Sequence, residues 1–319
     1  MKPRAVLSRL AEADLRLLRI FVAIAESGGL AAAELRLNIS RSVISRHLKD
    51  LEQRLGMRLC ERGRSGFALT EEGQVVLEAT RRLLAQIDNF RAEVADLQTG
   101  MRGELNLVVF DKFVTNPDCR LGECIAALAD EAPGVSLNVH VAGASEIEKG
   151  LLEGRFHIGV HPFHRASDSL VSIPLFVESM RLYASPRHPL LAGGAHPDDD
   201  ALRRAALVGL GYHSPNMEHF WRLGLEPAAR AFEQEGSVLL ISSGRYVGFL
   251  PDHYAREFET RGQLVRLESD TLRYQCEWHA SVTRSPAPGR IARRFLALIE
   301  AAHDLARISR DDGAGFKAE

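Results

Sequence analysis

Cysteine is scarce in this chain, and its spacing excludes the usual cysteine-based sites. The 319 residues contain four cysteines, and no two of them stand in the CxxC spacing of zinc or redox motifs. In a reducing compartment we expect buried free thiols rather than structural disulfides. A redox role for Cys119 or Cys124 stays open, although five residues along a helix turn two side chains about 140° apart.

Long apolar runs are also missing from the sequence. The apolar run near the start, residues 21–25, is far too short for a signal sequence or a membrane span. We therefore expect a cytoplasmic protein that has no membrane partner.

The motifs of common enzyme chemistry are absent as well. The sequence has no Gly-x-Ser-x-Gly elbow, no phosphate-binding loop and no defensible pairing of a cysteine with a histidine. Histidines occur at 157, 161 and 164, but strand alternation would place the first two about 13 Å apart, too far for one ion. We expect no enzyme activity, no metal site and no cofactor.

The length and the charge distribution indicate more than one domain, with a basic N-terminal end. A chain of 319 residues exceeds one ordinary core. Residues 1–70 carry 13 Lys and Arg against 7 Asp and Glu, a formal charge of +6, and the remaining residues carry −8. A local basic excess is typical of a polyanion binder, although a solvated basic face would look the same.

Apolar periodicity predicts three helices in the first 55 residues. The first begins at about Asp14 and ends at the glycines 28 and 29; its apolar stripe is Leu15, Leu18, Val22 and Ala25. The second covers residues 30–37, and Ser40 can cap the third, which covers residues 41–55. The third helix buries Ile44, Leu48, Leu51 and Leu55, and it turns Arg41, Ser42, Ser45, Arg46 and Lys49 outward.

Two helices joined by a tight turn, with small hydroxyls and arginines at the start of the second, fit the major groove of DNA. Residues 59–70 then predict a hairpin with Arg62 and Arg64 near its tip, suitable for a wing that touches phosphates or the minor groove. The alternative is a small helical packing module with solvated arginines, because this geometry also occurs in proteins that never meet DNA.

Residues 17–73 resemble the DNA-binding domain of LysR-type transcription regulators, without insertion or deletion. The similarity rests on LRIFVAIAESGG, on SRSVISRHLKDLEQRLGMRL and on the closing LTEEG. Glu34 replaces the family's usual small residue and Cys60 its usual phenylalanine, and residues 1–13 are an extension. The resemblance implies that Ser42, Ser45 and Arg46 reach base edges or adjacent phosphates, that Lys49 shares this face, and that Arg41, Arg62 and Arg64 anchor the DNA backbone.

A long helix is predicted over residues 71–98, after Thr70 as N-cap. Steps of four and three relate its apolar residues Val76, Leu83, Ile87, Phe90, Val94 and Leu97, with Thr80 the polar member of the series. At 1.5 Å per residue the helix would span about 42 Å. It could pack on its own chain, but the resemblance implies a linker helix that pairs with a second copy.

The remaining sequence predicts an α/β architecture, which makes the chain α/β overall. Short β-like runs at 105–110, 135–141, 156–160, 206–212 and 247–250 alternate with helical segments. Four pieces of this region resemble the two-lobed LysR-type effector domain, which is related to periplasmic binding proteins. They are GELNLVVF, LLEGRFHIGV, PLFVESMRLYASPRHPL and GRYVGFLP. The domain would cover 99–308, with lobe I at about 103–176 and 281–308, lobe II at about 177–280, and a tail at 309–319.

Ligands of open α/β sheets bind at the carboxyl ends of strands and between lobes. The positions implied for an effector are Asp111, Thr115, Asn116, Ser145, His161, Tyr212, His213, Arg245 and Tyr246. Tyr246 stands where the family commonly has the second glycine of Gly-x-Gly, so its ring would fill part of the pocket. Arg245, His161 and the free amides of helix N-termini would suit a carboxylate effector.

The sequence therefore predicts a regulator that binds promoter DNA as a dimer or tetramer and whose binding is modulated by a small-molecule effector. One rival is an enzyme or solute-binding protein with the basic end as a tether. A second rival is a DNA-compacting protein that binds without sequence preference.

Overall fold

The computed structural model describes residues 10–63, 66–99, 101–163, 165–194, 196–211 and 215–303. Contacts divide the chain into two compact units. The first contains Met1–Arg91 and the short piece Leu152–Arg155, and the second contains Ala92–Leu151 and Phe156–Glu319. Among the described helices, none combines the length and the apolar character that crossing a membrane requires.

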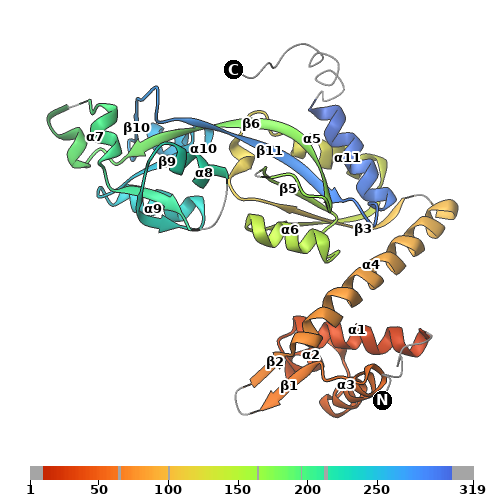
Figure 1. Cartoon of the computed structure of the whole chain (residues 1–319). Helices are drawn as coiled ribbons and strands as arrows, with labels where there is room; N and C mark the ends of the chain where they lie inside the picture. The colour runs from red at the N-terminus through yellow and green to blue at the C-terminus, as the bar shows by residue number, and fades with distance from the viewer. Residues whose placement is uncertain are drawn as a thin grey trace. The chain divides into compact units, whose positions relative to one another are not determined.

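The first unit is a small helical domain with a two-stranded hairpin (Figure 1). Its elements are α1 (Glu12–Glu26), α2 (Leu30–Leu37), α3 (Arg41–Leu55), β1 (Cys60–Gly63), β2 (Gly66–Leu69) and most of α4 (Glu71–Thr99). Local sequence sets the breaks: Gly29 at φ 142° separates α1 from α2, and Asn38 in the left-handed region ends α2. The helices and hairpin therefore form where the sequence predicts them.

The core of this unit lies between α1 and α3. Ile44, Leu48 and Leu51 of α3 are buried, as the spacing predicts, and Leu55 packs at the edge. In α1 the predicted stripe is displaced, because the most buried residues are Phe21 and Ile24 rather than Leu15, Val22 and Ala25. Contacts with both α2 and α3 bury a wider face of α1, and the bulkier side chains occupy its centre.

The helix α4 begins at a built cap and has two different halves. The Thr70 hydroxyl accepts a hydrogen bond from the Gly73 amide at 2.9 Å and donates one to the Arg58 carbonyl at 2.8 Å. Leu77 and Thr80, near the start, are buried. Further along, Phe90 is 67% exposed and Val94 is 46% exposed. The first half thus packs on its own domain, and the later apolar residues do not; the side chain of Leu97 is outside the described ones.

The second unit is built on one nine-stranded mixed sheet. Its strands are β3 (Arg102–Val109), β4 (Gly134–Val141), β5 (Ile158–Pro162), β6 (Leu170–Ala184), β7 (Leu207–Leu210), β8 (Pro227–Ala231), β9 (Val247–Pro251), β10 (Val265–Leu267) and β11 (Tyr274–Thr283). Its helices are η1 (Phe113–Thr115), α5 (Leu121–Glu131), α6 (Ala144–Leu152), η2 (Pro189–Gly194), α7 (Asp199–Arg203), α8 (Pro215–Arg222), α9 (Gln234–Ser242), α10 (Asp252–Thr260) and α11 (Arg290–Ala302). The strand order is β4-β3-β5-β11-β6-β9-β7-β8, and β10 pairs with β6.

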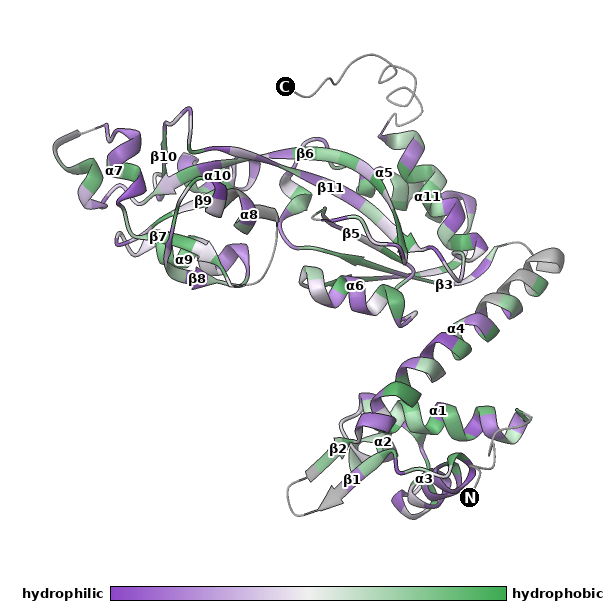
Figure 2. Cartoon of the chain, viewed as in Figure 1, coloured by the Kyte–Doolittle hydropathy of each residue, from purple (hydrophilic) through white to green (hydrophobic). Residues whose placement is uncertain are grey.

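Two long antiparallel strands, β6 and β11, run side by side through the whole unit (Figure 1). One hydrophobic core contains Phe176 of β6 and Trp278 of β11, and a second core contains Met180 of β6 and Cys276 of β11. The strands therefore pass from one lobe to the other, and the division predicted near residue 280 falls inside β11. The amphipathic α11 packs on the first lobe through Ile291, Phe295 and Ile299 (Figure 2).

The predicted strands match in place, with shifted ends. The run expected at 156–160 is strand only from Ile158, and the run expected at 206–212 ends at Leu210. The expected runs left out the long strands β6 and β11, as well as β8 and β10.

Candidate functional site

The exposed face of α3 carries the residues predicted to read DNA. Arg41, Ser42, Arg46 and Lys49 are exposed, and Ser45 is half-buried. Ser42, Ser45, Arg46 and Lys49 are turned away from the buried Ile44, Leu48 and Leu51, which hold the helix on α1, and Arg41 lies in the first turn. The hydroxyls of Ser40 and Ser42 lie 3.1 Å apart at the start of α3. The fold thus presents a polar, cationic helix surface without large apolar side chains, as insertion into a groove requires.

The N-terminus of α3 is held by a carboxylate from α2. The backbone amide of Arg41 donates a hydrogen bond to Glu34 Oε1 at 3.1 Å. Glu34, which stands where the family usually has a small residue, therefore acts at the start of α3 rather than in packing alone. The anionic oxygen suits the positive end of a helix dipole.

The hairpin β1–β2 forms the wing. Its antiparallel register runs from Cys60 opposite Leu69 to Gly63 opposite Gly66. Arg62 lies in β1, where its backbone is described and its side chain is not, and Arg64 lies outside the described residues. Their role at the wing stays a prediction.

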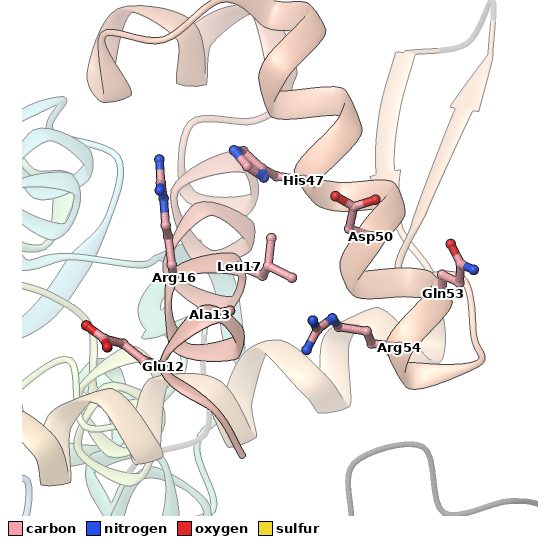
Figure 3. Close-up of a pocket in the computed structure, with 8 residues that line it drawn as sticks. All are labelled: Glu12, Ala13, Arg16, Leu17, His47, Asp50, Gln53 and Arg54. Atoms are coloured by element: carbon pink, nitrogen blue, oxygen red, sulfur yellow. The ribbon is translucent and has the colours of Figure 1, made fainter. Parts of the chain in front are cut away.

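A groove of about 880 Å³ lies between α1 and α3, on another side of α3 (Figure 3). It is lined by Glu12, Ala13, Arg16, Leu17, His47, Asp50, Gln53 and Arg54. At about 100° per residue, the centre of the α3 residues in this groove lies roughly 130° around the helix from the centre of the predicted DNA-facing set. Beside it Asp14 is buried, and its pKa is lowered by the Ala11 amide and the Arg54 guanidinium. Arg54, by its pairing with Asp14, thus holds α3 to α1, and this groove is separate from the predicted DNA-facing set.

In the second unit, the loop after β3 meets the starts of α9 and α10. Asp111 Oδ2 accepts a hydrogen bond from the backbone amide of Gln234 at 3.4 Å. Lys112 Nζ lies 2.9 Å from Glu235 Oε1 and 5.5 Å from the centre of the Tyr254 ring. We call the meeting of residues 111–115 with residues 234–235 and 253–254 the lobe junction.

A buried chain of polar groups continues through the lobe junction. The Thr115 hydroxyl lies 2.8 Å from His253 Nδ1, and His253 Nε2 lies 3.1 Å from Glu178 Oε2 on β6. His253 and Glu178 are 7% and 4% exposed. Helix α10 and strand β6, which runs through both lobes, are thereby tied to the loop that follows β3.

Two acceptor oxygens at the lobe junction are buried without a hydrogen-bond partner among the described residues: Asp111 Oδ1 and Gln234 Oε1. Gln234 is 5% exposed. Burial raises the pKa of the Asp111 carboxyl. The nearby carboxylates Glu233 and Glu178 raise this pKa further, and the Gln234 backbone amide and Lys112 lower it. Buried acceptors in folded proteins are normally satisfied, so this pair marks a place where a donor is expected.

Family profiles match both units. The profile described as "Bacterial regulatory helix-turn-helix protein, lysR family" matches residues 15–74, and the profile described as "LysR substrate binding domain" matches residues 98–304. The chain belongs to the LysR family. This LysR-type chain is a DNA-binding transcription regulator with an effector-binding domain, and it is not an enzyme.

Individual relatives agree with this assignment of the LysR-type chain. The HTH-type transcriptional activator BauR of Pseudomonas aeruginosa is 40% identical over 295 residues, which cover 92% of this chain and 96% of that protein. Full-length OxyR C199D from Pseudomonas aeruginosa superposes with a TM-score of 0.64 at 19% identity, covering 93% of this chain and 95% of that one. CbnR, a LysR family transcriptional regulator, superposes with a TM-score of 0.63 at 21% identity, covering 91% and 99%. The two structures share the fold of this LysR-type regulator.

The structure brings some of the effector positions predicted for this LysR-type regulator together and separates others. Asp111 and Thr115 meet at the lobe junction. Asn116 is buried nearby, with its Oδ1 accepting a hydrogen bond from the Asp118 amide at 2.9 Å. His161 is buried in the sheet, with Nε2 3.0 Å from the Ser281 hydroxyl and Nδ1 2.9 Å from the Pro162 carbonyl. These bonds give Asn116 and His161 structural roles.

The remaining predicted effector positions lie elsewhere or are not described. Ser145 is exposed in the first turn of α6. Arg245 is exposed beside His188 and Pro189 in a hollow of lobe II, and Tyr246 packs against a lobe II core. Tyr212 and His213 lie outside the described residues. Arg245 and His161, the two side chains on which the expectation of a carboxylate effector rested, therefore lie in different parts of the second unit.

Sequence reasoning missed Lys112, Gln234, Glu235, His253 and Tyr254 of the lobe junction, and Glu178 beside it. The first five lie within four residues of a strand end: Lys112 after β3, Gln234 and Glu235 after β8, and His253 and Tyr254 after β9. The rule that ligands gather at carboxyl ends of strands would have found them, had it been applied to every strand. Glu178 gave no such signal, because it lies inside β6.

The cysteines of this LysR-type regulator are thiols rather than disulfides, and burial works against their reactivity. Cys60, Cys124 and Cys276 are buried, and Cys119 is half-buried. Burial raises the pKa of the Cys124 thiol to about 11 and also raises the pKa of Cys119. Because the thiolate is the reactive form, neither thiol has the low pKa of a redox sensor.

Proposed function

We propose that this LysR-type protein binds promoter DNA sequence-specifically through α3. The observation that carries the proposal is the exposed row of Arg41, Ser42, Arg46 and Lys49 on a helix whose opposite face is locked in the core. Arginine and small hydroxyl side chains supply donors for base edges and phosphates. The relative named a transcriptional activator, at 40% identity, supports activation as the outcome. A regulator of this kind works in the cytoplasm, where the bacterial genome lies.

The binding form we propose is a homodimer or a dimer of two dimers. The exposed Phe90 and Val94 on α4 are separated by four residues and lie on one side of the helix, which suits a seam with a second copy. The effector binds at the lobe junction and changes the relative geometry of the DNA-binding pairs. It does so through a difference in its affinity for two assemblies, since no other ligand effect shifts an equilibrium.

The test captures genomic fragments on the purified full-length protein and footprints those that it retains. The comparison variant combines Ser42→Ala with Arg46→Ala, and the matched control is Arg16→Ala, on the exposed side of α1. We expect a few upstream fragments with dyad symmetry, retained by the parent and the control and lost by the double variant. Indiscriminate retention would instead indicate a DNA-compacting protein, and no retention would contradict DNA binding.

A further inference from the structure

The lobe junction contains more acceptors and acidic groups than donors. Asp111, Glu178, Glu233 and Glu235 supply carboxylates. Among the described residues, the basic groups facing them are Lys112, paired with Glu235, and His253, paired with Glu178. The unpartnered Asp111 Oδ1 and Gln234 Oε1 add two buried acceptor atoms at the same place. The Gln234 backbone amide donates to Asp111 Oδ2, so the two residues that carry these oxygens are in contact.

At the N-terminus of α9, where an anionic effector would otherwise bind, one amide is already bonded to a carboxylate of the chain itself. The first amide of α9, that of Gln234, donates to the Asp111 carboxylate. A carboxylate effector placed there would face Asp111 and would meet like charge in a partly buried site. An N–H donor with positive charge would instead satisfy both free oxygens and offset the acidic excess.

We propose, on the basis of the function proposed above, that the effector carries a protonated amine bound by Asp111 Oδ1 and Gln234 Oε1. A primary ammonium has three N–H donors, enough for both oxygens and one further acceptor. A neutral amide would satisfy the hydrogen bonds but leave the carboxylates uncompensated, so the charge favours the ammonium. The group binds between residues of both lobes, and it therefore couples effector binding to the closure of the lobe junction.

The binding test uses the full-length protein and three matched series of short linear compounds: alkylammonium chlorides, ω-amino acids and sodium alkanoates of equal chain lengths. Binding is measured by calorimetry and by thermal shift at about pH 7.5, where the amines are protonated. We expect binding by members of the two series that carry an ammonium group and none by the alkanoates. Binding by the alkanoates alone, or by all three series equally, would overturn the proposal.

Three variants make the test specific to the lobe junction. Asp111→Asn keeps the shape and removes the charge, and Gln234→Met removes the acceptor at similar volume. We expect each to weaken amine binding by about tenfold, because each removes a hydrogen bond to a charged group. Asp130→Asn, the same change at an exposed carboxyl of α5, is the control and keeps the parent affinity. Equal affinities in all variants would place the amine elsewhere and contradict the proposal.

The footprint of the same protein preparation separates this inference from the proposed function. If the protein protects a specific site on DNA but no amine binds, the two oxygens hold water or another donor, and the amine proposal is wrong while DNA recognition stands. If amines bind as expected but no specific footprint forms, promoter recognition fails instead.

Discussion

Glu34 of α2 accepts a hydrogen bond from the backbone amide of Arg41 at 3.1 Å, and so places a carboxylate at the N-terminus of the DNA-reading helix. A helix N-terminus is also a favourable place for a DNA phosphate. The carboxylate stabilises α3 and, by the same position, repels an approaching phosphate. We therefore expect Glu34 to order the start of α3 at some cost in DNA affinity.

We predict that Glu34→Gln increases DNA affinity. Glutamine keeps an acceptor for the Arg41 amide and removes the negative charge, so affinity for any DNA should rise about threefold to tenfold at low salt. Fluorescence anisotropy at two salt concentrations measures the change, and Glu12→Gln on α1 is the control. An unchanged or weaker affinity for Glu34→Gln would show that the carboxylate does not face the phosphates.

The exposed Phe90 and Val94 of α4 yield a prediction about assembly. Replacing both by serine removes apolar area that we assign to contact with a second copy, and the assembly should dissociate at micromolar concentrations. Light scattering after size-exclusion chromatography gives the mass directly. Arg82→Ser, at an exposed position of the same helix, should leave the mass unchanged. If the double serine variant keeps the parent mass, the seam lies elsewhere.

The DNA-binding unit could be predicted closely because its signals are local. In α3 a polar residue starts the helix, Gly56 ends it, and buried leucines recur at regular spacing between them. The structure differs from the prediction where tertiary packing determines which residues are buried. In α1 the contacts with two other helices moved the buried stripe toward Phe21 and Ile24, which periodicity alone could not show.

The effector unit was harder to predict because its decisive contacts are remote in sequence. The strands β6 and β11 pass from one core to another, so their burial does not alternate simply along their length. Asp111 was found because it follows a recognisable strand. Its partner Gln234 lies 123 residues away on another lobe, and only the tertiary structure brings the two together. The surroundings of His161 could not be predicted for the same reason, since its hydrogen-bond partner Ser281 comes from β11.

Buried histidines of the second unit predict acid sensitivity. Burial lowers the pKa of His157, His188 and His279 in the folded protein. The unfolded chain therefore takes up these protons first, and the free energy of unfolding should fall as the pH drops through about 6.5. Urea unfolding at about pH 7.5 and about pH 5.5 measures the loss, in a range where most carboxyl groups remain ionised.

The contribution of one histidine can be isolated by substitution. His157 Nδ1 accepts a hydrogen bond from the Asn106 amide at 3.0 Å, and His157→Gln can keep an acceptor there without a titrating ring. We expect a smaller loss of unfolding free energy between the two pH values in this variant. Ser136→Gln, at an exposed position of β4, is the comparison and should keep the loss seen in the parent. A parent-like loss in His157→Gln would contradict the assignment.

Gly73 and Gly122 form a matched pair that tests the packing of α4 on the wing. A Cβ at Gly73 would lie 2.0 Å from the carbonyl oxygen of Leu59, whereas one at Gly122 would meet nothing within 4 Å. Gly73→Ala must therefore push α4 away from the base of the hairpin, and it should cost about 1–3 kcal/mol of unfolding free energy in the first unit. Gly122→Ala, in α5, should instead add up to about 1 kcal/mol, because alanine favours the helix. Urea unfolding of both variants gives the two signs, and Gly73→Ala should also lose DNA affinity because the wing moves. Equal stabilities would show that the close approach of Gly73 to Leu59 is not needed to join α4 to the DNA-binding unit.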